Sequence, residues 1–313
     1  GLWFDPASVG EIAGLELRYA GYKFQPPRVD HWFGSSVEQS IRVDGATINI
    51  SDSNILNNGN TALYLEKATT TIQNTKIDQG SMAINALDGV VSFDNVKISN
   101  FTHANGPLGI VRSFPSFKNL QLENNLFDGV FLENPTFRGE TTLGKELLWA
   151  LSYPVIPAGS ILHLAPGAKF LLLSKGIIEV NGGRLLVEGT VDEPVEIKPL
   201  VAGGSWGGVR FTNSDSVLEN VRLVRGNNVS NSSEGLVFAS NSKLKLKNIM
   251  IEQLQTGKNI IKSENSQLDL DVVNLGYDVK PLTETCAVDI KNGTLKLRSV
   301  YFKNLTHGLY AFL

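Results

Sequence analysis

The chain has 313 residues, a formal net charge of -3 and one cysteine, Cys286. This length allows a large core, and a lone cysteine excludes both a disulfide framework and a cysteine-based zinc cluster. The acidic balance, without any basic stripe, argues against a nucleic-acid partner, because phosphate binding requires clustered lysine and arginine. No apolar run reaches the roughly 20 residues that span a bilayer, so we expect no membrane insertion in this segment.

Short alternating apolar runs separated by Asn, Gly, Asp and Ser fill the chain and predict an all-β protein. Early examples are the segments 62–66, 70–73 and 75–78. The longest helical candidate, Lys145–Leu151, would make roughly two turns. Further on, Lys243–Lys247 alternates lysine with leucine, which predicts a strand with one solvated face.

One pattern recurs along these runs: an apolar residue, any residue, a polar residue, an apolar residue, any residue and an apolar residue. Its central positions are Asp52, Asn74, Asn95, Asn119, Asn220, Asn248 and Ser299, with weaker copies at Gly14 and Val272. From Asp52 to Asn119 and from Asn220 to Ser299, neighbouring copies lie 21–28 residues apart, a period typical of solenoids. Each repeat holds two or three β segments, whereas a leucine-rich repeat has one strand. We therefore predict a parallel β-helix with coils of about 21–28 residues.

The recurrent polar residue has a structural interpretation. Asn tolerates the left-handed backbone conformation of a tight corner. Amides stacked on successive coils can also donate and accept hydrogen bonds along the column. We expect these seven positions to form a ladder of buried corner side chains, and we do not interpret them as ligand-binding residues.

A longer repeat is superimposed on the coils, because the segment 89–103 matches the segment 293–307 at an offset of 204 residues. The predicted modules are residues 1–140, the C-terminal part of a first module, and residues 141–313, a second module truncated at its C-terminal end. A longer repetitive parent protein would supply neighbouring modules as partners. Since His103 and His307 recur with the module, we interpret both as structural or surface residues.

The segments 153–170, 183–197 and 203–211 contain Pro166-Gly167, Glu188-Gly-Thr190 and Trp206-Gly-Gly208. They resemble the opening of modules in right-handed parallel β-helix proteins of the pectate-lyase-like superfold, especially large cell-surface β-helix proteins. The resemblance implies a right-handed parallel β-helix (solenoid) and an extracellular or cell-surface location. Together with the Asn pattern it covers nearly the whole chain. It is specific for the fold and not for the function, since the superfold hosts lyases, hydrolases, epimerases and adhesins.

Polysaccharide-cleaving members of this superfold use Ca²⁺ held by several carboxylates, or two or three positioned carboxylates. In this chain the carboxylates of the first coils are scattered: Asp44, Asp52, Asp78, Asp88 and Asp94. We interpret them as turn and surface residues, and we interpret Asp128-Gly129 as an ordinary turn. We predict no catalytic residue and no cofactor; Ca²⁺ would be required only if the chain were an enzyme.

Aromatic and charged residues gather in an insert at 21–40. Its candidate binding residues are Tyr22, Phe24, Arg28, Asp30, His31, Trp32 and Phe33. Rings in a loop on a rigid scaffold suit contact with a carbohydrate or a surface protein, whereas the alternative is that they cover the flank of the coils. The leading hypothesis is a non-enzymatic extracellular adhesion or rod module. The alternative is a polysaccharide lyase or glycoside hydrolase acting on an acidic polysaccharide.

Overall fold

The computed structural model describes residues 1–20, 39–226, 235–254, 259–276, 286–305 and 307–312. In these ranges the regular secondary structure consists of β-strands alone. The chain is a parallel β-solenoid of about 10 turns with coils of about 24 residues. The predicted all-β parallel solenoid is confirmed. The helical candidate at 145–151 is wrong, because a turn there leads directly into strand β15 (Leu148–Leu151).

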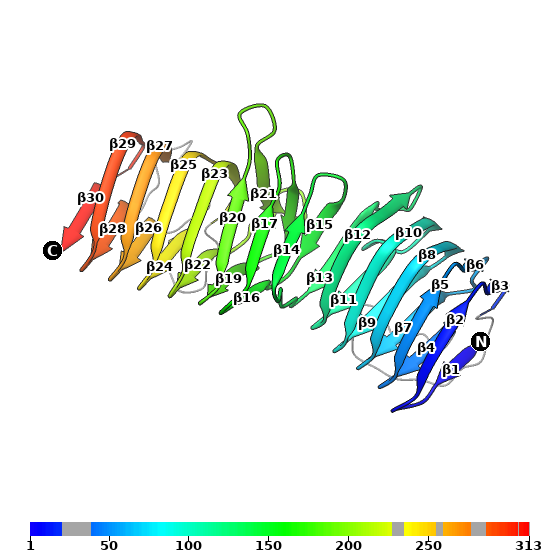
Figure 1. Cartoon of the computed structure of the whole chain (residues 1–313). Coiled ribbons are helices and arrows are strands. Elements are labelled where there is room, and N and C mark those ends of the chain that lie inside the picture. Colours follow the sequence, from blue (N-terminus) through cyan, green and yellow to red (C-terminus); the bar gives the residue numbers. More distant parts are fainter. Residues whose placement is uncertain (21–38, 227–234, 255–258, 277–285, 306, 313) are drawn as a thin grey trace. The chain divides into compact units, whose positions relative to one another are not determined.

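The solenoid divides into two compact units, residues 1–135 and 136–313, which we describe separately (Figure 1). The module boundary at residue 140 concerns the longer repeat and stays a prediction.

In the first unit each coil passes through up to three strand segments, and equivalent segments pair in parallel. The first column contains β1 (Leu2–Phe4), β4 (Gln39–Asp44), β7 (Thr61–Glu66), β9 (Met82–Leu87), β11 (Leu108–Val111) and β13 (Gly129–Glu133). The second contains β2 (Val9–Ala13), β5 (Thr47–Ser51), β8 (Thr69–Gly80), β10 (Val90–Phe101) and β12 (Phe114–Glu123). The short third strands, β3 (Glu16–Arg18) and β6 (Asn54–Leu56), pair onward with the end of β8.

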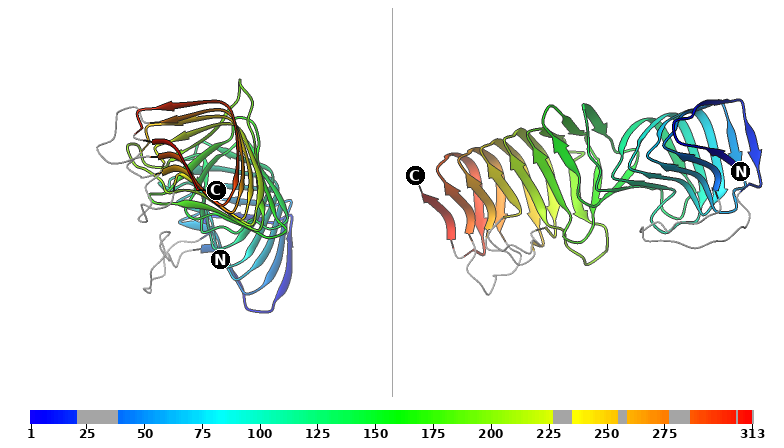
Figure 2. Two further views of the ribbon diagram at one scale, coloured as in Figure 1. Left: turned by 90° about the vertical axis from the view of Figure 1, so that its left-hand side faces the viewer. Right: turned by 90° about the horizontal axis from the view of Figure 1, so that it is seen from below.

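The second unit repeats this scheme. One column contains β16 (Val155–Pro157), β19 (Ile177–Asn181), β22 (Gly208–Thr212), β24 (Val237–Ser240), β26 (Asn259–Glu264), β28 (Cys286–Lys291) and β30 (His307–Phe312). The first coils of this unit contain two further series of paired strands. One series is β14 (Glu140–Leu143), β17 (Ile161–Leu164) and β20 (Arg184–Glu188). The other is β15, β18 (Lys169–Leu172) and β21 (Val195–Pro199). Both series pair with β23 (Asp215–Val224), which β25 (Lys243–Glu252), β27 (Gln267–Gly276) and β29 (Thr294–Lys303) follow. Figure 2 shows how these strands lie on separate faces of the coils.

The core follows from the alternation of side chains along each strand. Parallel pairing brings Ile50, Ile72, Phe93 and Phe117 into one register, so like residues stack from coil to coil. The Phe93 and Phe117 rings stack with centroids 5.5 Å apart. In the second unit, Trp206 is fully buried, and its indole N–H donates to the Val224 carbonyl at 2.8 Å. The lone cysteine, Cys286, is a small buried side chain.

Three corners with left-handed backbone close each coil of the first unit. The first column of positive φ is Gly45, Lys67, Asp88 and Arg112; the second is Asp52, Asn74, Asn95 and Asn119; the third is Asn57, Gln79, Asn100 and Asn124. In the second unit, equivalent columns include Asn213, Asn241, Asn265 and Asn292, and then Asn220, Asn248, Val272 and Ser299. The sequence pattern marks only the middle column of each unit. In the first unit the other two columns mix residue types, whereas the second unit also repeats asparagine in the column from Asn213 to Asn292, which the pattern did not identify.

The middle column forms side-chain hydrogen bonds from coil to coil. The Asn74 amide donates to Asp52 at 3.1 Å, and the Asn95 amide donates to Asn74 at 2.9 Å. However, Asn74 and Asn95 are exposed, so the expectation of buried amides is wrong for this unit. In the second unit Asn220 is buried, and its amide donates to the Gly189 carbonyl at 2.7 Å. The corner therefore selects Asn mainly for its backbone conformation, whether or not the side chain is buried.

Candidate functional site

The candidate binding residues of the insert, Tyr22, Phe24, Arg28, Asp30, His31, Trp32 and Phe33, lie outside the described residues. Their assignment stays a prediction. The site developed below is built from described residues alone.

The scattered carboxylates of the first unit each have a partner close by. Asp88 accepts two hydrogen bonds from Arg112, at 2.7 and 2.8 Å, and Asp94 pairs with Lys118 at 2.9 Å. Asp44 pairs with Arg42 at 2.7 Å within one strand. The Asp88–Arg112 and Asp94–Lys118 pairs join neighbouring coils. These carboxylates therefore form ion pairs between coils and do not converge on a common site.

Asp78 shows the same use of a carboxylate. Its Oδ1 accepts hydrogen bonds from the Ser99 hydroxyl and the Asn100 amide, both at 2.7 Å. Burial alone would raise the pKa of Asp78, but these two hydrogen bonds and the Lys76 ammonium hold the pKa below its ordinary value. A general acid needs a pKa shifted upward, so the environment of Asp78 favours a structural carboxylate.

The three histidines that the structure describes lie in separate places. His103 is partly buried in the turn after β10, its Nδ1 accepts the Asn105 backbone N–H at 3.3 Å, and burial lowers the pKa of His103. His307 is exposed at the start of β30. His163 lies between two glutamates, 3.0 Å from Glu140 and 3.4 Å from Glu188.

The turn at Asp128-Gly129 is closed by the Asp128 carboxylate. It accepts from the Asn125 backbone N–H at 2.9 Å and from the Asn125 amide at 2.8 Å. The Asp128 side chain therefore has a local structural role.

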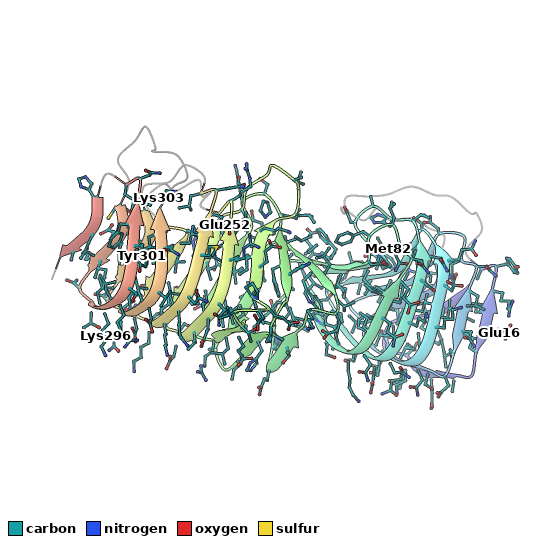
Figure 3. The ribbon with its side chains drawn as sticks, turned by 90° about the horizontal axis from the view of Figure 1, so that it is seen from above. Glu16, Met82, Glu252, Lys296, Tyr301 and Lys303 are labelled. Atoms are coloured by element: carbon teal, nitrogen blue, oxygen red, sulfur yellow. The ribbon has the colours of Figure 1, made fainter. Side chains whose placement is uncertain are left out.

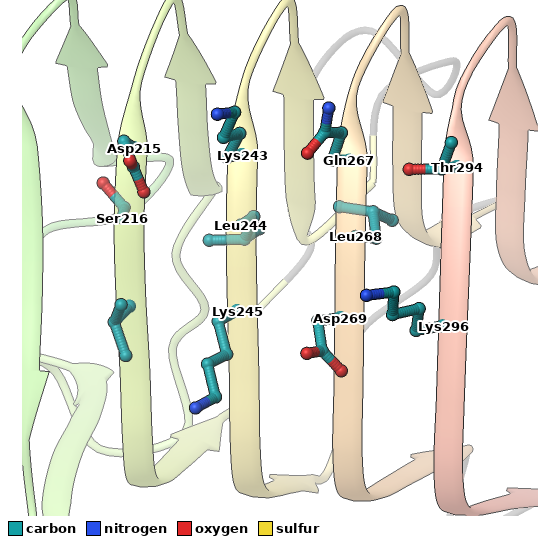
Figure 4. Close-up of a pocket in the computed structure, with 11 residues that line it drawn as sticks. Asp215, Ser216, Lys243, Leu244, Lys245, Gln267, Leu268, Asp269, Thr294 and Lys296 are labelled. Atoms are coloured by element: carbon teal, nitrogen blue, oxygen red, sulfur yellow. The ribbon is translucent and has the colours of Figure 1, made fainter.

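A groove of about 290 Å³ lies on the outer face of β23, β25, β27 and β29. We call it the lysine groove, because Lys243, Lys245 and Lys296 line it (Figure 4). Two rows of outward residues cross the strands in register. One is Asp215, Lys243, Gln267 and Thr294; the other is Val217, Lys245, Asp269 and Lys296. Between these rows, the strand segments at Ser216, Leu244 and Leu268 line the groove.

The neighbouring row of the same face differs, because its charges are neutralised. It contains Glu219, Lys247, Asp271 and Arg298 in register. Lys247 pairs with Glu219, and Arg298 lies 3.4 Å from both Asp271 and Asp269. Arg298 thereby occupies the one carboxylate that stands between Lys245 and Lys296.

The lysine groove consequently has an excess of positive charge. Among the residues that the structure describes, Lys243, Lys245 and Lys296 make no ion pair within 4.0 Å. Two carboxylates, Asp215 and Asp269, also line the groove, so three lysines stand against two carboxylates and leave one positive charge in excess. Lys296 projects outward from β29 (Figure 3), so the groove is open to solvent.

The groove was not predicted from the sequence, although the strand at Lys243–Lys247 was predicted correctly. Leu244 and Leu246 are buried in β25 and the intervening lysines face outward, as the alternation indicates. The groove depends on which residues neighbouring coils place beside those lysines. Aligning the chain on the corner positions Asn220, Asn248 and Val272 would have shown the rows of charge.

The fold and this groove define a parallel β-solenoid with a polar, cationic groove on one lateral face. Comparisons of the chain with protein-family models, with curated proteins and with solved structures found no match. Within the described ranges, no helix is long and apolar enough to cross a membrane. The same ranges contain no group of three or more His, Cys, Asp or Glu side chains placed to hold a metal ion.

Proposed function

We propose that the chain is a non-enzymatic extracellular surface module, used for adhesion or as a structural rod within a larger repetitive protein. In this proposal the coils are right-handed and belong to the pectate-lyase-like superfold. Its partners are a carbohydrate or a surface protein, and neighbouring modules of the same parent.

The observation that carries the proposal is the use of ion pairs between coils. Asp88–Arg112, Asp94–Lys118 and Glu219–Lys247 each join residues one coil apart. Carboxylates bound in this way stabilise a stack and leave a persistent pattern of charge on its faces. Exposed ion pairs contribute only up to about 1 kcal/mol each to the free energy of unfolding. Their main effect here is to fix the positions of charged side chains on the surface.

A rigid solenoid suits adhesion, because its faces present side chains at a fixed spacing set by the strands, ~4.8 Å apart. Binding then costs less ordering of the protein than it would on a flexible surface. The lysine groove supplies one such face, and the insert at 21–40 supplies a second candidate surface.

The test uses the purified chain and a panel of acidic and neutral polysaccharides. Retention by affinity electrophoresis measures binding, while reducing ends and the ultraviolet absorbance of unsaturated sugars measure hydrolysis and lyase cleavage. We expect retention without product. Product formation that disappears when a single carboxylate of the chain is replaced would overturn the proposal. Antibody labelling of intact source cells tests the location, and antigen confined to the cell interior would contradict it.

A further inference from the structure

We propose that the lysine groove binds a linear acidic polysaccharide that lies across β23, β25, β27 and β29. This inference rests on the proposed surface-binding function and names the class of ligand and its site.

The first argument is charge. Three lysines line the groove without an ion pair among the described residues, whereas the adjacent Lys247 and Arg298 are paired. An ammonium group left open to solvent beside a groove attracts anions without first having to break a protein contact. On this face, the lysine groove is thus the place where electrostatic attraction favours an anionic ligand most.

The second argument is spacing. Lys245 and Lys296 occupy one row, two strands apart, which corresponds to ~10 Å. Lys243 and Lys245 are two residues apart on β25, or ~7 Å. A polymer whose charges recur along its length can meet Lys245 and Lys296 together when it runs across the strands.

The third argument is the chemistry of the lining. Gln267 and Thr294 offer neutral donors and acceptors that suit sugar hydroxyls, and Asp215 offers a further acceptor. None of the described residues lining the groove is aromatic, although nucleic-acid strands are bound largely by stacking on rings. The lining also lacks the aromatic anchors that dominate protein interfaces. These features favour an acidic polysaccharide over either macromolecule.

Arg298 has a positioning role in this proposal. By holding the Asp269 carboxylate at 3.4 Å, it leaves Lys245 and Lys296 available to the ligand. Replacing Arg298 would let Asp269 neutralise those lysines, and binding would weaken even though Arg298 does not itself line the groove.

The experiment compares three probes by affinity electrophoresis of the whole chain: polygalacturonate, dextran sulfate and neutral dextran. The variant Lys243→Gln/Lys245→Gln/Lys296→Gln removes the groove charge. A matched control, Lys169→Gln/Lys175→Gln/Lys291→Gln, removes the same charge from exposed sites elsewhere in the unit. We expect the groove variant to bind acidic probes roughly tenfold more weakly, and the control to bind like the parent.

A second variant guards against misfolding as an explanation. Asp215→Asn removes a carboxylate that lines the groove, so it should strengthen retention of the acidic probes, and a damaged protein would not gain binding. Retention of polygalacturonate alone identifies carboxylates as the preferred groups, while retention of both acidic probes identifies charge density.

The inference is overturned if neither acidic probe is retained, or if the groove and control variants weaken binding equally. Retention of neutral dextran to the same extent would overturn it too. Each of these results leaves the proposed surface function standing, because that function fails only on cleavage or on an intracellular location.

Discussion

A column of buried serines offers the sharpest test of how the coils are held together. Ser214, Ser242 and Ser266 follow the first corner on successive coils of the second unit, and all three are buried. The Ser242 hydroxyl accepts the Ser214 backbone N–H at 3.1 Å and donates to the Ser240 carbonyl at 2.7 Å. Ser266 accepts the Ser242 N–H in the same way at 3.0 Å. The side chain thus supplies a hydrogen bond between coils.

Replacing Ser242 by alanine removes that acceptor from a site that is 4% exposed. The Ser240 carbonyl keeps a second donor, the Asn213 N–H at 3.0 Å. The Ser214 N–H loses its side-chain acceptor, and an unsatisfied buried donor costs about 1–3 kcal/mol. Alanine itself fits such a corner, since Ala46 and Ala68 occupy the equivalent position in the first unit. The expected loss therefore comes from the hydrogen bond and not from packing.

Hydrogen–deuterium exchange read by mass spectrometry measures this locally, which suits a solenoid whose coils need not unfold together. Peptides containing Ser214 should exchange faster in Ser242→Ala by roughly five- to 150-fold, the factor equivalent to 1–3 kcal/mol. The matched control is Ser240→Ala, which removes an outward hydroxyl from the same coil and leaves the backbone bonds intact. If both variants exchange at the parent rate, the serine column does not stabilise the stack.

Two further substitutions test the corners of the first unit. Because the folded-state pKa of Asp78 lies below its usual value of 3.8, its stabilisation is present above that pH and is lost as the pH falls through the folded pKa. Asp78→Asn should therefore unfold at a lower thermal midpoint than the parent at pH 7, and the difference between the two midpoints should shrink as the pH falls. A difference in midpoint that is the same at all pH values would contradict this. Asn95→Leu should unfold at lower urea than Asn95→Gly, because φ is +57° at this corner and a left-handed non-glycine residue costs ~1–2 kcal/mol. Equal urea midpoints for the two variants would show that the backbone conformation is not what selects asparagine here.

The amino-acid sequence by itself determined the fold class and the coil length. Alternation as in Lys243–Lys247 reports which residues face inward, because a strand turns successive side chains to opposite sides. The repeat of Asn74 and Asn95 reports a corner, because few residues accept positive φ. Both signals are local, and so they can be detected without knowing which coil lies next to which.

The tertiary structure alone decided where charge is neutralised and where it is left open. Asp269 and Arg298 are 29 residues apart, and whether they meet depends on the register of β27 against β29. Aligning the corner positions Val272 and Ser299 places the two residues on adjacent strands, but the pattern along either strand does not tell whether their side chains meet. The burial of Asn220 and the exposure of Asn95 differ for the same reason, since the same corner motif meets different neighbours in the two units. The lysine groove on β23, β25, β27 and β29 is formed by residues of four stacked coils. The sequence of Lys243–Lys247 alone therefore predicted only a strand with one solvated face.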